Sequence, residues 1–95
     1  MKIPWLPGLP PAPKLAWCEK VTASATSPQH LRLVPAGEPL VTGGGLQVPT
    51  LCGLDLAGGW DTHETDFEQI RRAVANQHET SRVCTACTDI ALAHA

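Results

Sequence analysis

The strongest pattern in this sequence is Cys84-Thr85-Ala86-Cys87, a pair of cysteines separated by two residues. A turn over the two intervening residues points both thiolates inward, so the pair can supply two of the four ligands of a tetrahedral zinc ion. The same spacing also serves thiol redox chemistry, where it opens a helix after a strand within a βαβ unit. The chain before Cys84 shows no such unit, and little chain follows Cys87. The pair therefore favours a metal site.

The third predicted ligand is Cys52, within Thr50-Leu51-Cys52-Gly53. A glycine directly after a ligand cysteine lets the chain turn tightly, so that backbone amides can face the sulfur. This pattern is typical of half of a metal knuckle. An ordinary structural thiol is the alternative interpretation.

The fourth ligand stays open at this point. His30 begins a predicted strand at 29–34, and pairing with a second predicted strand at 46–52 would bring His30 close to Cys52. Cys18 would instead complete an all-cysteine site, and His63 is a weaker candidate because we expect it to be exposed. We expect Zn²⁺ as the cofactor, with these ligands: His30, Cys52, Cys84 and Cys87.

The length and composition of the chain support a stabilising metal. With 95 residues and only 4% aromatic residues, one domain with a thin aliphatic core is expected. Chains of this size often add a metal or disulfides, and in a reducing cytosol cysteines at this spacing favour the metal. No apolar run approaches the ~20 residues that a membrane helix needs, and prolines interrupt the segment that a signal peptide would require. We therefore expect a cytoplasmic protein with no membrane association.

The chain divides into a proline-rich arm, residues 1–16, and a single zinc-binding domain, residues 17–95. The arm contains Pro4, Pro7, Pro10, Pro11 and Pro13, which remove backbone donors and favour extended geometry. The spacing of these prolines also resembles ligands of proline-binding modules, although a simple extended arm is the preferred interpretation.

Two strands and one helix are predicted in the domain. The strands 29–34 and 46–52 would form a β-hairpin across a glycine-rich loop. Thr65 and Glu68 fit a capping box, Phe67, Ile70 and Val74 follow at helical spacing, and the helix is expected to end near 76–78. A short apolar tail at 88–94 can be helical, and Asp61 is interpreted as part of an acidic helix start. The predicted fold is a small α+β domain with a β-hairpin and one main α-helix.

A family resemblance is carried by His30, Thr50-Leu51-Cys52-Gly53, Trp60 and Val83-Cys84-Thr85-Ala86-Cys87. In these residues the chain resembles small zinc-binding proteins of actinobacteria and their phages, over about residues 29–88. The resemblance implies the same four ligands and no assigned activity. The proline-rich arm, Cys18 and the glycine-rich loop depart from that pattern. Trp60 is expected to pack over the metal site.

The chemistry expected of this site is structural. A zinc deaminase would need His-x-Glu and Pro-Cys-x-x-Cys, whereas His63 and Glu64 are adjacent here and Val83 stands in place of the proline. We expect a non-enzymatic structural-zinc interaction module with a regulatory role that binds a protein partner. One alternative is a thiol redox module that uses Cys84 and Cys87.

A second alternative is a nucleic-acid-binding zinc module. It would use a small basic patch formed by Arg71, Arg72 and Arg82, although neighbouring arginines on a helix usually form only a solvated face. The net charge of −2 disfavours an electrostatic grip on nucleic acid.

Overall fold

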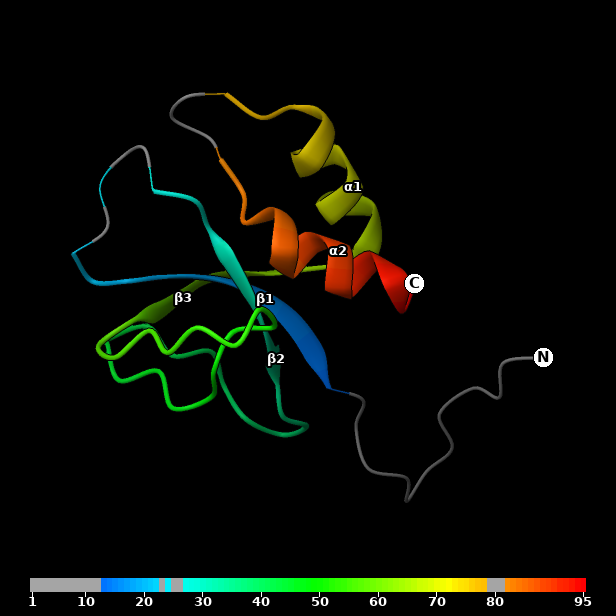
Figure 1. Cartoon of the computed structure of the whole chain (residues 1–95). Coiled ribbons are helices and arrows are strands. Elements are labelled where there is room, and N and C mark those ends of the chain that lie inside the picture. Colours follow the sequence, from blue (N-terminus) through cyan, green and yellow to red (C-terminus); the bar gives the residue numbers. More distant parts are fainter. Residues whose placement is uncertain (1–12, 23, 25–26, 79–81) are drawn as a thin grey trace, which may run out of the picture.

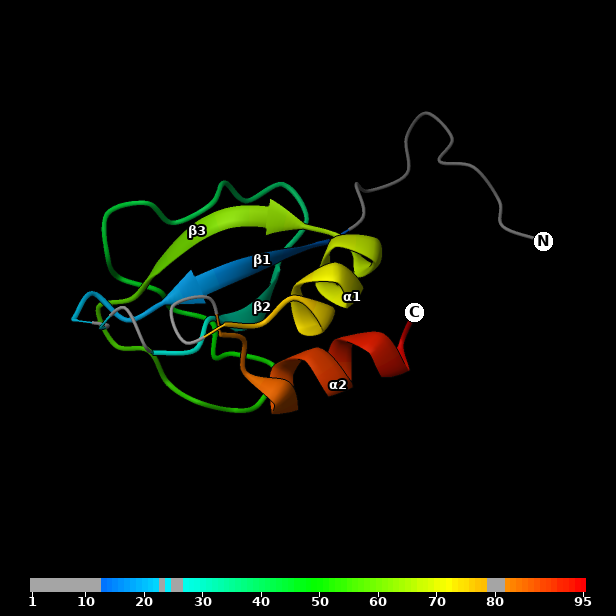
Figure 2. The same cartoon turned by 90° about the horizontal axis from the view of Figure 1, so that it is seen from above.

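A three-stranded antiparallel sheet in the order β2-β1-β3 organises this protein (Figure 1). The computed structural model describes residues 13–22, 24, 27–78 and 82–95. Both helices lie on one face of the sheet (Figure 2). The predicted α+β class with a β-hairpin is confirmed. The elements are β1 (Lys14–Glu19), β2 (His30–Val34), β3 (Trp60–Thr65), α1 (Phe67–Ala75) and α2 (Thr85–Ala93).

The central strand β1 begins inside the range that was predicted as the arm. Lys14, Leu15 and Ala16 pair with β2, and Ala16 is completely buried. These residues belong to the sheet although they precede the predicted boundary at residue 16. Pro13 precedes β1, and residues 1–12 of the predicted arm lie outside the described residues.

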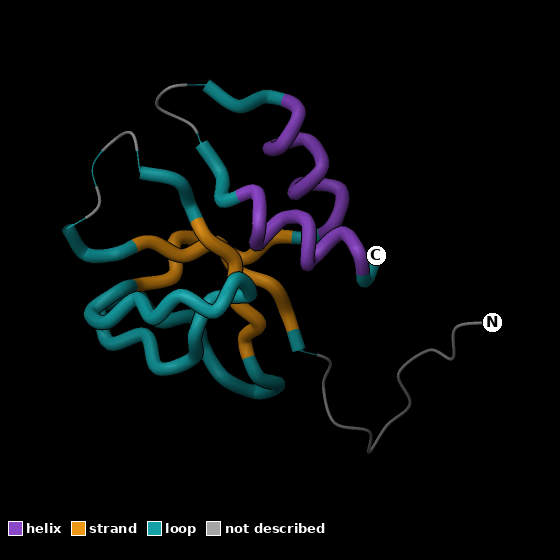
Figure 3. The backbone as a smooth tube through the Cα atoms, in the orientation of Figure 1, coloured by secondary structure: helices purple, strands orange, loops and turns teal. Residues whose placement is uncertain are grey.

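The hairpin pairs β1 with β2, in a register that runs from Lys14 opposite Val34 to Cys18 opposite His30. The predicted strand 29–34 is confirmed by β2. The predicted strand 46–52 is wrong, because this segment is a loop (Figure 3). Pro49 has no N–H to donate to a ladder. The segment contacts β2 through one backbone hydrogen bond, in which Leu51 N donates to Leu31 O at 2.8 Å.

The strand β3 was not predicted, and it changes the role of Asp61. This residue belongs to β3 rather than to the start of a helix, and it is only 3% exposed. Its carboxylate accepts two hydrogen bonds from the Arg32 guanidinium, at 2.7 and 2.5 Å, and one from Val41 N at 2.7 Å. Because β1 lies between β2 and β3, this ion pair spans the central strand, where the small side chain of Ala16 is the register partner of Arg32.

Helix α1 begins one residue later than the predicted capping box. Asp66 is the N-cap, and its carboxylate accepts a hydrogen bond from Gln69 N at 2.8 Å. Thr65 cannot cap the helix because it ends β3, and its hydroxyl donates instead to the Gln69 side chain at 3.3 Å. The helix ends at Ala75, with Asn76 as its C-cap, as expected.

Helix α2 makes this a fold with two helices of equal length rather than one main helix. It contains the apolar tail, so the helical interpretation of that tail is confirmed. The main core lies between both helices and the sheet, and a smaller cluster lies on the opposite face. The main core comprises Trp17, Leu31, Ile70, Val83, Cys87 and Ala91, and the smaller cluster comprises Cys18, Leu46 and Leu56.

Within the part of the chain that the structure describes, neither helix has the length and apolar character needed to cross a bilayer.

Candidate metal centre

Four side chains from three separate segments meet at the outer edge of the sheet. One nitrogen or sulfur atom from each of His30, Cys52, Cys84 and Cys87 lies within 4.8 Å of the others. His30 begins the edge strand β2, Cys52 lies in a turn of the long loop, and the cysteine pair opens α2. The structure therefore brings together all four residues predicted as ligands. This cluster could hold a metal ion.

The distances around His30 fit a tetrahedral ion. Its Nδ1 atom lies 3.6 Å from Cys52 Sγ and 3.8 Å from Cys87 Sγ. A tetrahedral zinc with Zn–S about 2.3 Å and Zn–N about 2.0 Å separates its sulfur and nitrogen ligands by roughly 3.5 Å. An ion could therefore bind at this point with small adjustments of the side chains, and Nδ1 is the histidine atom that faces it.

The turn around Cys52 has the predicted knuckle form. Gly53 has a φ angle of +86°, a conformation that L-amino acids with side chains rarely adopt. Thr50 N donates to Leu54 O at 3.1 Å, and Leu54 N donates to Thr50 Oγ1 at 3.0 Å, which closes the loop. Thr50 Oγ1 also lies 3.1 Å from Cys52 Sγ. The turn therefore positions the sulfur and surrounds it with polar groups.

These polar groups change the ionisation of Cys52. Burial raises the pKa of this thiol, but hydrogen bonds from the Thr50 hydroxyl and the Leu54 backbone oppose burial. Together with the contacts to Cys87 and His30, they bring the pKa of Cys52 down to about 6. The turn thus favours a thiolate, which is the form that binds metal.

Cys87 is held in the opposite state. Burial raises its pKa to about 11, and the neighbouring sulfurs of Cys52 and Cys84 act in the same direction. In the absence of an ion, one thiolate at Cys52 and a neutral thiol at Cys87 is therefore the favoured arrangement. A divalent cation among the sulfurs would reverse this preference, because its charge stabilises every thiolate around it.

A short backbone clamp places the cysteine pair beside His30. Gln29 N donates to Arg82 O at 3.0 Å, and Cys84 N donates to Gln29 O at 2.7 Å. Val83 thereby forms an isolated parallel bridge with Gln29. No sequence pattern marks Gln29 as important, because its contribution comes from backbone groups that any residue carries.

Cys84 is the N-cap residue of α2, and Cys87 lies in the first turn. The pair therefore opens a helix, as a redox pair would. However, all strand pairs of the sheet are antiparallel, and the described residues contain no βαβ unit.

The other candidate ligands lie away from the cluster. Cys18 is fully buried in the small apolar cluster on the opposite face, and this burial, together with the charge of Asp61, raises its pKa to about 12. His63 lies in β3 with its ring centroid 6.4 Å from that of Trp17. His78 and His94 are exposed. His30, and not Cys18, is thus the residue that joins the three other cysteines.

The tryptophan in the core around Cys87 is Trp17, whereas Trp60 was expected to pack over the metal site. Trp17 packs in this core, and Cys52 and Cys84 pack against it. Trp60 instead begins β3, opposite Glu19 of β1. Trp17 directly follows the predicted proline-rich arm, and no local sequence pattern links it to the cysteines.

The three arginines of the proposed basic patch, Arg71, Arg72 and Arg82, are all exposed. Arg72 forms an exposed ion pair with Glu68 at 2.7 Å, which offsets its charge.

No family model, no curated protein and no solved structure matches this chain.

Proposed function

We propose that this protein is a non-enzymatic module that is stabilised by one structural zinc ion and that binds a protein partner. The observation that carries the proposal is the convergence of His30, Cys52, Cys84 and Cys87 within 4.8 Å. The actinobacterial and phage family suggested by the motifs is part of the same proposal.

The chemistry of the donors supports zinc. Three thiolates and one imidazole form a soft ligand set, and a tetrahedral set of sulfur and nitrogen donors is typical of zinc. Hard cations such as Mg²⁺ and Ca²⁺ prefer oxygen ligands, and none of the four donors is an oxygen. These free thiols also suit a reducing compartment, which supports the proposed cytoplasmic location.

The number of donors supports a structural role. Four protein ligands fill a tetrahedral ion and leave no position for the water that a catalytic zinc activates. The ion would join the edge strand, the long loop and α2, which otherwise share a thin core. Structural zinc sites contribute on the order of 10–16 kcal/mol of apparent binding free energy, and this becomes folding free energy.

Elemental analysis of the protein purified without chelator tests the zinc site. We expect one zinc per chain, lost in His30→Ala and retained in His63→Ala, because His63 is an exposed histidine outside the cluster. Cys87→Ala and Cys18→Ala form a second matched pair, since both thiols are fully buried and only Cys87 belongs to the cluster. A metal-free protein, or zinc that survives His30→Ala, would overturn the proposal.

A protein partner fits the surface better than nucleic acid does. The net charge is −2, and one of the three arginines of the basic patch is paired with Glu68. Large apolar side chains are exposed instead, among them Val21 and Leu54. Binding to single- or double-stranded nucleic acid at low salt, lost steeply as salt rises, would contradict this preference.

A thiol redox module is the second candidate, because the cysteine pair opens helix α2. In that case Cys84 and Cys87 would exchange a dithiol for a disulfide with a thiol or disulfide partner. Cys52→Ala separates the two functions, since it removes a zinc ligand and leaves the pair intact. Loss of folding with Cys52→Ala favours zinc, whereas a folded variant that still cycles against a glutathione redox buffer favours the redox module.

A further inference from the structure

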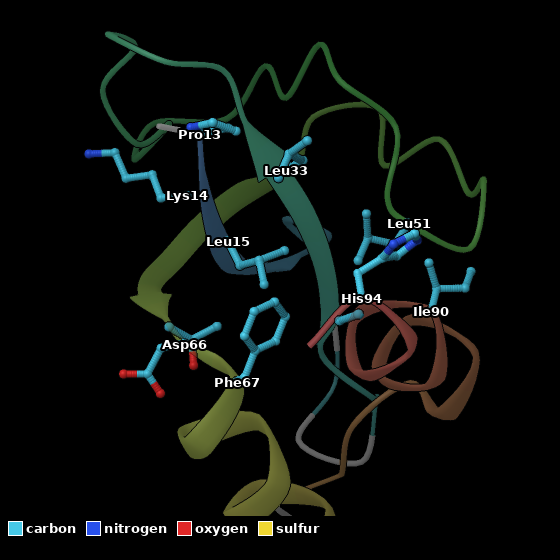
Figure 4. A pocket seen from close by; sticks show the side chains of 11 residues that line it. Pro13, Lys14, Leu15, Leu33, Leu51, Asp66, Phe67, Ile90 and His94 are labelled. Atoms are coloured by element: carbon cyan, nitrogen blue, oxygen red, sulfur yellow. The ribbon is translucent and has the colours of Figure 1, made fainter. Parts of the chain in front are cut away.

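An apolar groove lies between the first residues of β1 and the C-terminal end of α2. It has a volume of about 590 Å³. Figure 4 shows side chains from both strands of the hairpin and from both helices around it. Two of these side chains are exposed, Leu33 by 45% and Ile90 by 39%. Its apolar lining residues include Leu15, Leu33, Leu51, Phe67 and Ile90.

Exposed apolar side chains gathered around one cavity usually mark a surface that another group covers. The groove is not part of the metal centre, although Leu51 precedes Cys52 and α2 carries the cysteine pair. The group that covers the groove is therefore not a ligand of the metal centre.

The chain itself enters the domain at this groove. Pro13, the first residue of the first described segment, lines it at one end (Figure 4). The residues before it, 1–12, contain Ile3, Trp5, Leu6 and Leu9, and their single charged side chain is Lys2. Segments that remain solvated by themselves usually have low hydrophobicity and high charge. The composition of residues 1–12 is thus that of a segment that gains by covering apolar surface.

We propose that Trp5, Leu6 and Leu9 bind in this groove of the same chain. In polyproline geometry each residue advances the chain by about 3.1 Å, so the four residues from Pro13 to Leu9 could span roughly 12 Å, and the eight residues to Trp5 roughly 25 Å. Since Pro13 itself lines the groove, both side chains can reach its interior. The aromatic ring and the leucines match the apolar lining.

The prolines of the segment suit packing of this kind. A proline has no N–H for a strand ladder, so the segment would be held by its side chains rather than by pairing with the edge of the sheet. Proline also restricts the free chain, which lowers the conformational entropy that is lost on binding. Because the segment is covalently attached, its effective concentration at the groove is on the order of millimolar or higher.

The test labels the full-length protein with 5-fluorotryptophan and records ¹⁹F NMR spectra in H₂O and D₂O. The chain has three tryptophans, and Trp5→Phe assigns one signal. We expect the Trp5 signal to show less than about half of the solvent isotope shift of free fluorotryptophan. Ile90→Lys places a charge in the groove, and it should restore the full shift of Trp5.

Val21→Lys is the matched control, because Val21 is also an exposed aliphatic residue, at 50%, and does not line the groove. It should leave the Trp5 signal unchanged. Unchanged signals of Trp17 and Trp60 report an intact fold in each variant. If Ile90→Lys disturbs them, Leu33→Asp repeats the test on the opposite wall.

Three outcomes would overturn the proposal. The first is a fully solvent-shifted Trp5 signal in the unaltered protein, and the second is a protected signal that ignores substitutions in the groove. The third is protection that disappears on dilution as the mass falls from dimer to monomer by light scattering. In that case a second copy of the chain supplies the occupant.

Discussion

The backbone amide of Cys84 donates a hydrogen bond of 2.7 Å to the carbonyl oxygen of Gln29. This bond joins the residue before the histidine of the cluster to the first cysteine of the Cys-x-x-Cys pair. As a result, the position of the cysteine pair relative to His30 is set by the main chain. This part of the cluster is thus held by main-chain atoms, independently of the side chains that would bind an ion.

Substitution of Gly53 tests whether the knuckle turn prepares the metal site. Gly53 and Gly37 have φ angles of +86° and +82°, and an added Cβ would meet no atom within 4 Å at either position. Alanine at either glycine should therefore cost about 1–2 kcal/mol of unfolding free energy through backbone strain alone. Only Gly53→Ala should also weaken zinc binding, measured by competition with a chromophoric chelator. Equal zinc affinities in both variants would contradict a role for the turn.

Removal of one partner of the Arg32–Asp61 pair should destabilise the fold strongly. Arg32 and Asp61 are 1% and 3% exposed, and a buried charge that loses its partner costs about 3–5 kcal/mol. We expect Asp61→Asn to lower the free energy of unfolding, measured by urea titration, by about this amount. Glu68→Gln is the control, because the side chains of the Glu68–Arg72 pair are about 70% exposed and such pairs contribute less than about 1 kcal/mol. If both variants lose a similar free energy of unfolding, the buried pair does not contribute strongly to the stability of the fold.

The stability of the protein should fall at alkaline pH through Cys18. The pKa of this thiol is raised from 9.0 to about 12, first by burial and then by the charge of Asp61. In the unfolded chain the Cys18 thiol ionises near pH 9. The neutral thiol therefore contributes fully to the stability of the fold below pH 9, and this contribution is lost as the pH rises toward 12. One such thiol changes the free energy of unfolding by at most about 1.4 kcal/mol per pH unit.

Cys18→Ala should flatten this alkaline decrease when the unfolding free energy is measured by urea titration between pH 8 and 11. The variant also loses some packing, which would shift the whole curve without changing its slope. A curve that keeps the slope of the unaltered protein would exclude Cys18 as the origin of the decrease.

The cap of helix α1 gives a fourth prediction. Asp66→Ala should cost about 1 kcal/mol of unfolding free energy, because it removes the acceptor for Gln69 N. Thr65→Ala should leave helix content unchanged by far-ultraviolet circular dichroism, since the Thr65 hydroxyl binds only the Gln69 side chain in this region. A larger loss of helix from Thr65→Ala would restore the capping box predicted from sequence.

Much of the candidate site could be predicted because its signals are local. Three patterns each report the geometry of a few neighbouring residues. They are the spacing of Cys84 and Cys87, the glycine after Cys52, and the alternation of polar and apolar residues around His30. The antiparallel pairing assumed for the segments 29–34 and 46–52 was wrong. Nevertheless, one backbone hydrogen bond from Leu51 N to Leu31 O brings Cys52 beside His30.

Local sequence patterns were enough to predict four short elements of this protein: the metal-like cysteine pair, the knuckle turn, the strand at His30 and the amphipathic helix after Asp66. Local patterns did not predict that Lys14–Glu19 is the central strand, that β3 forms from a polar segment, or that Asp61 binds Arg32, because these features depend on the folded chain. The physical reason is that strand formation depends on partners and burial far along the chain. A polar residue such as Asp61 becomes favourable in the interior only when a distant residue satisfies its charge and hydrogen bonds.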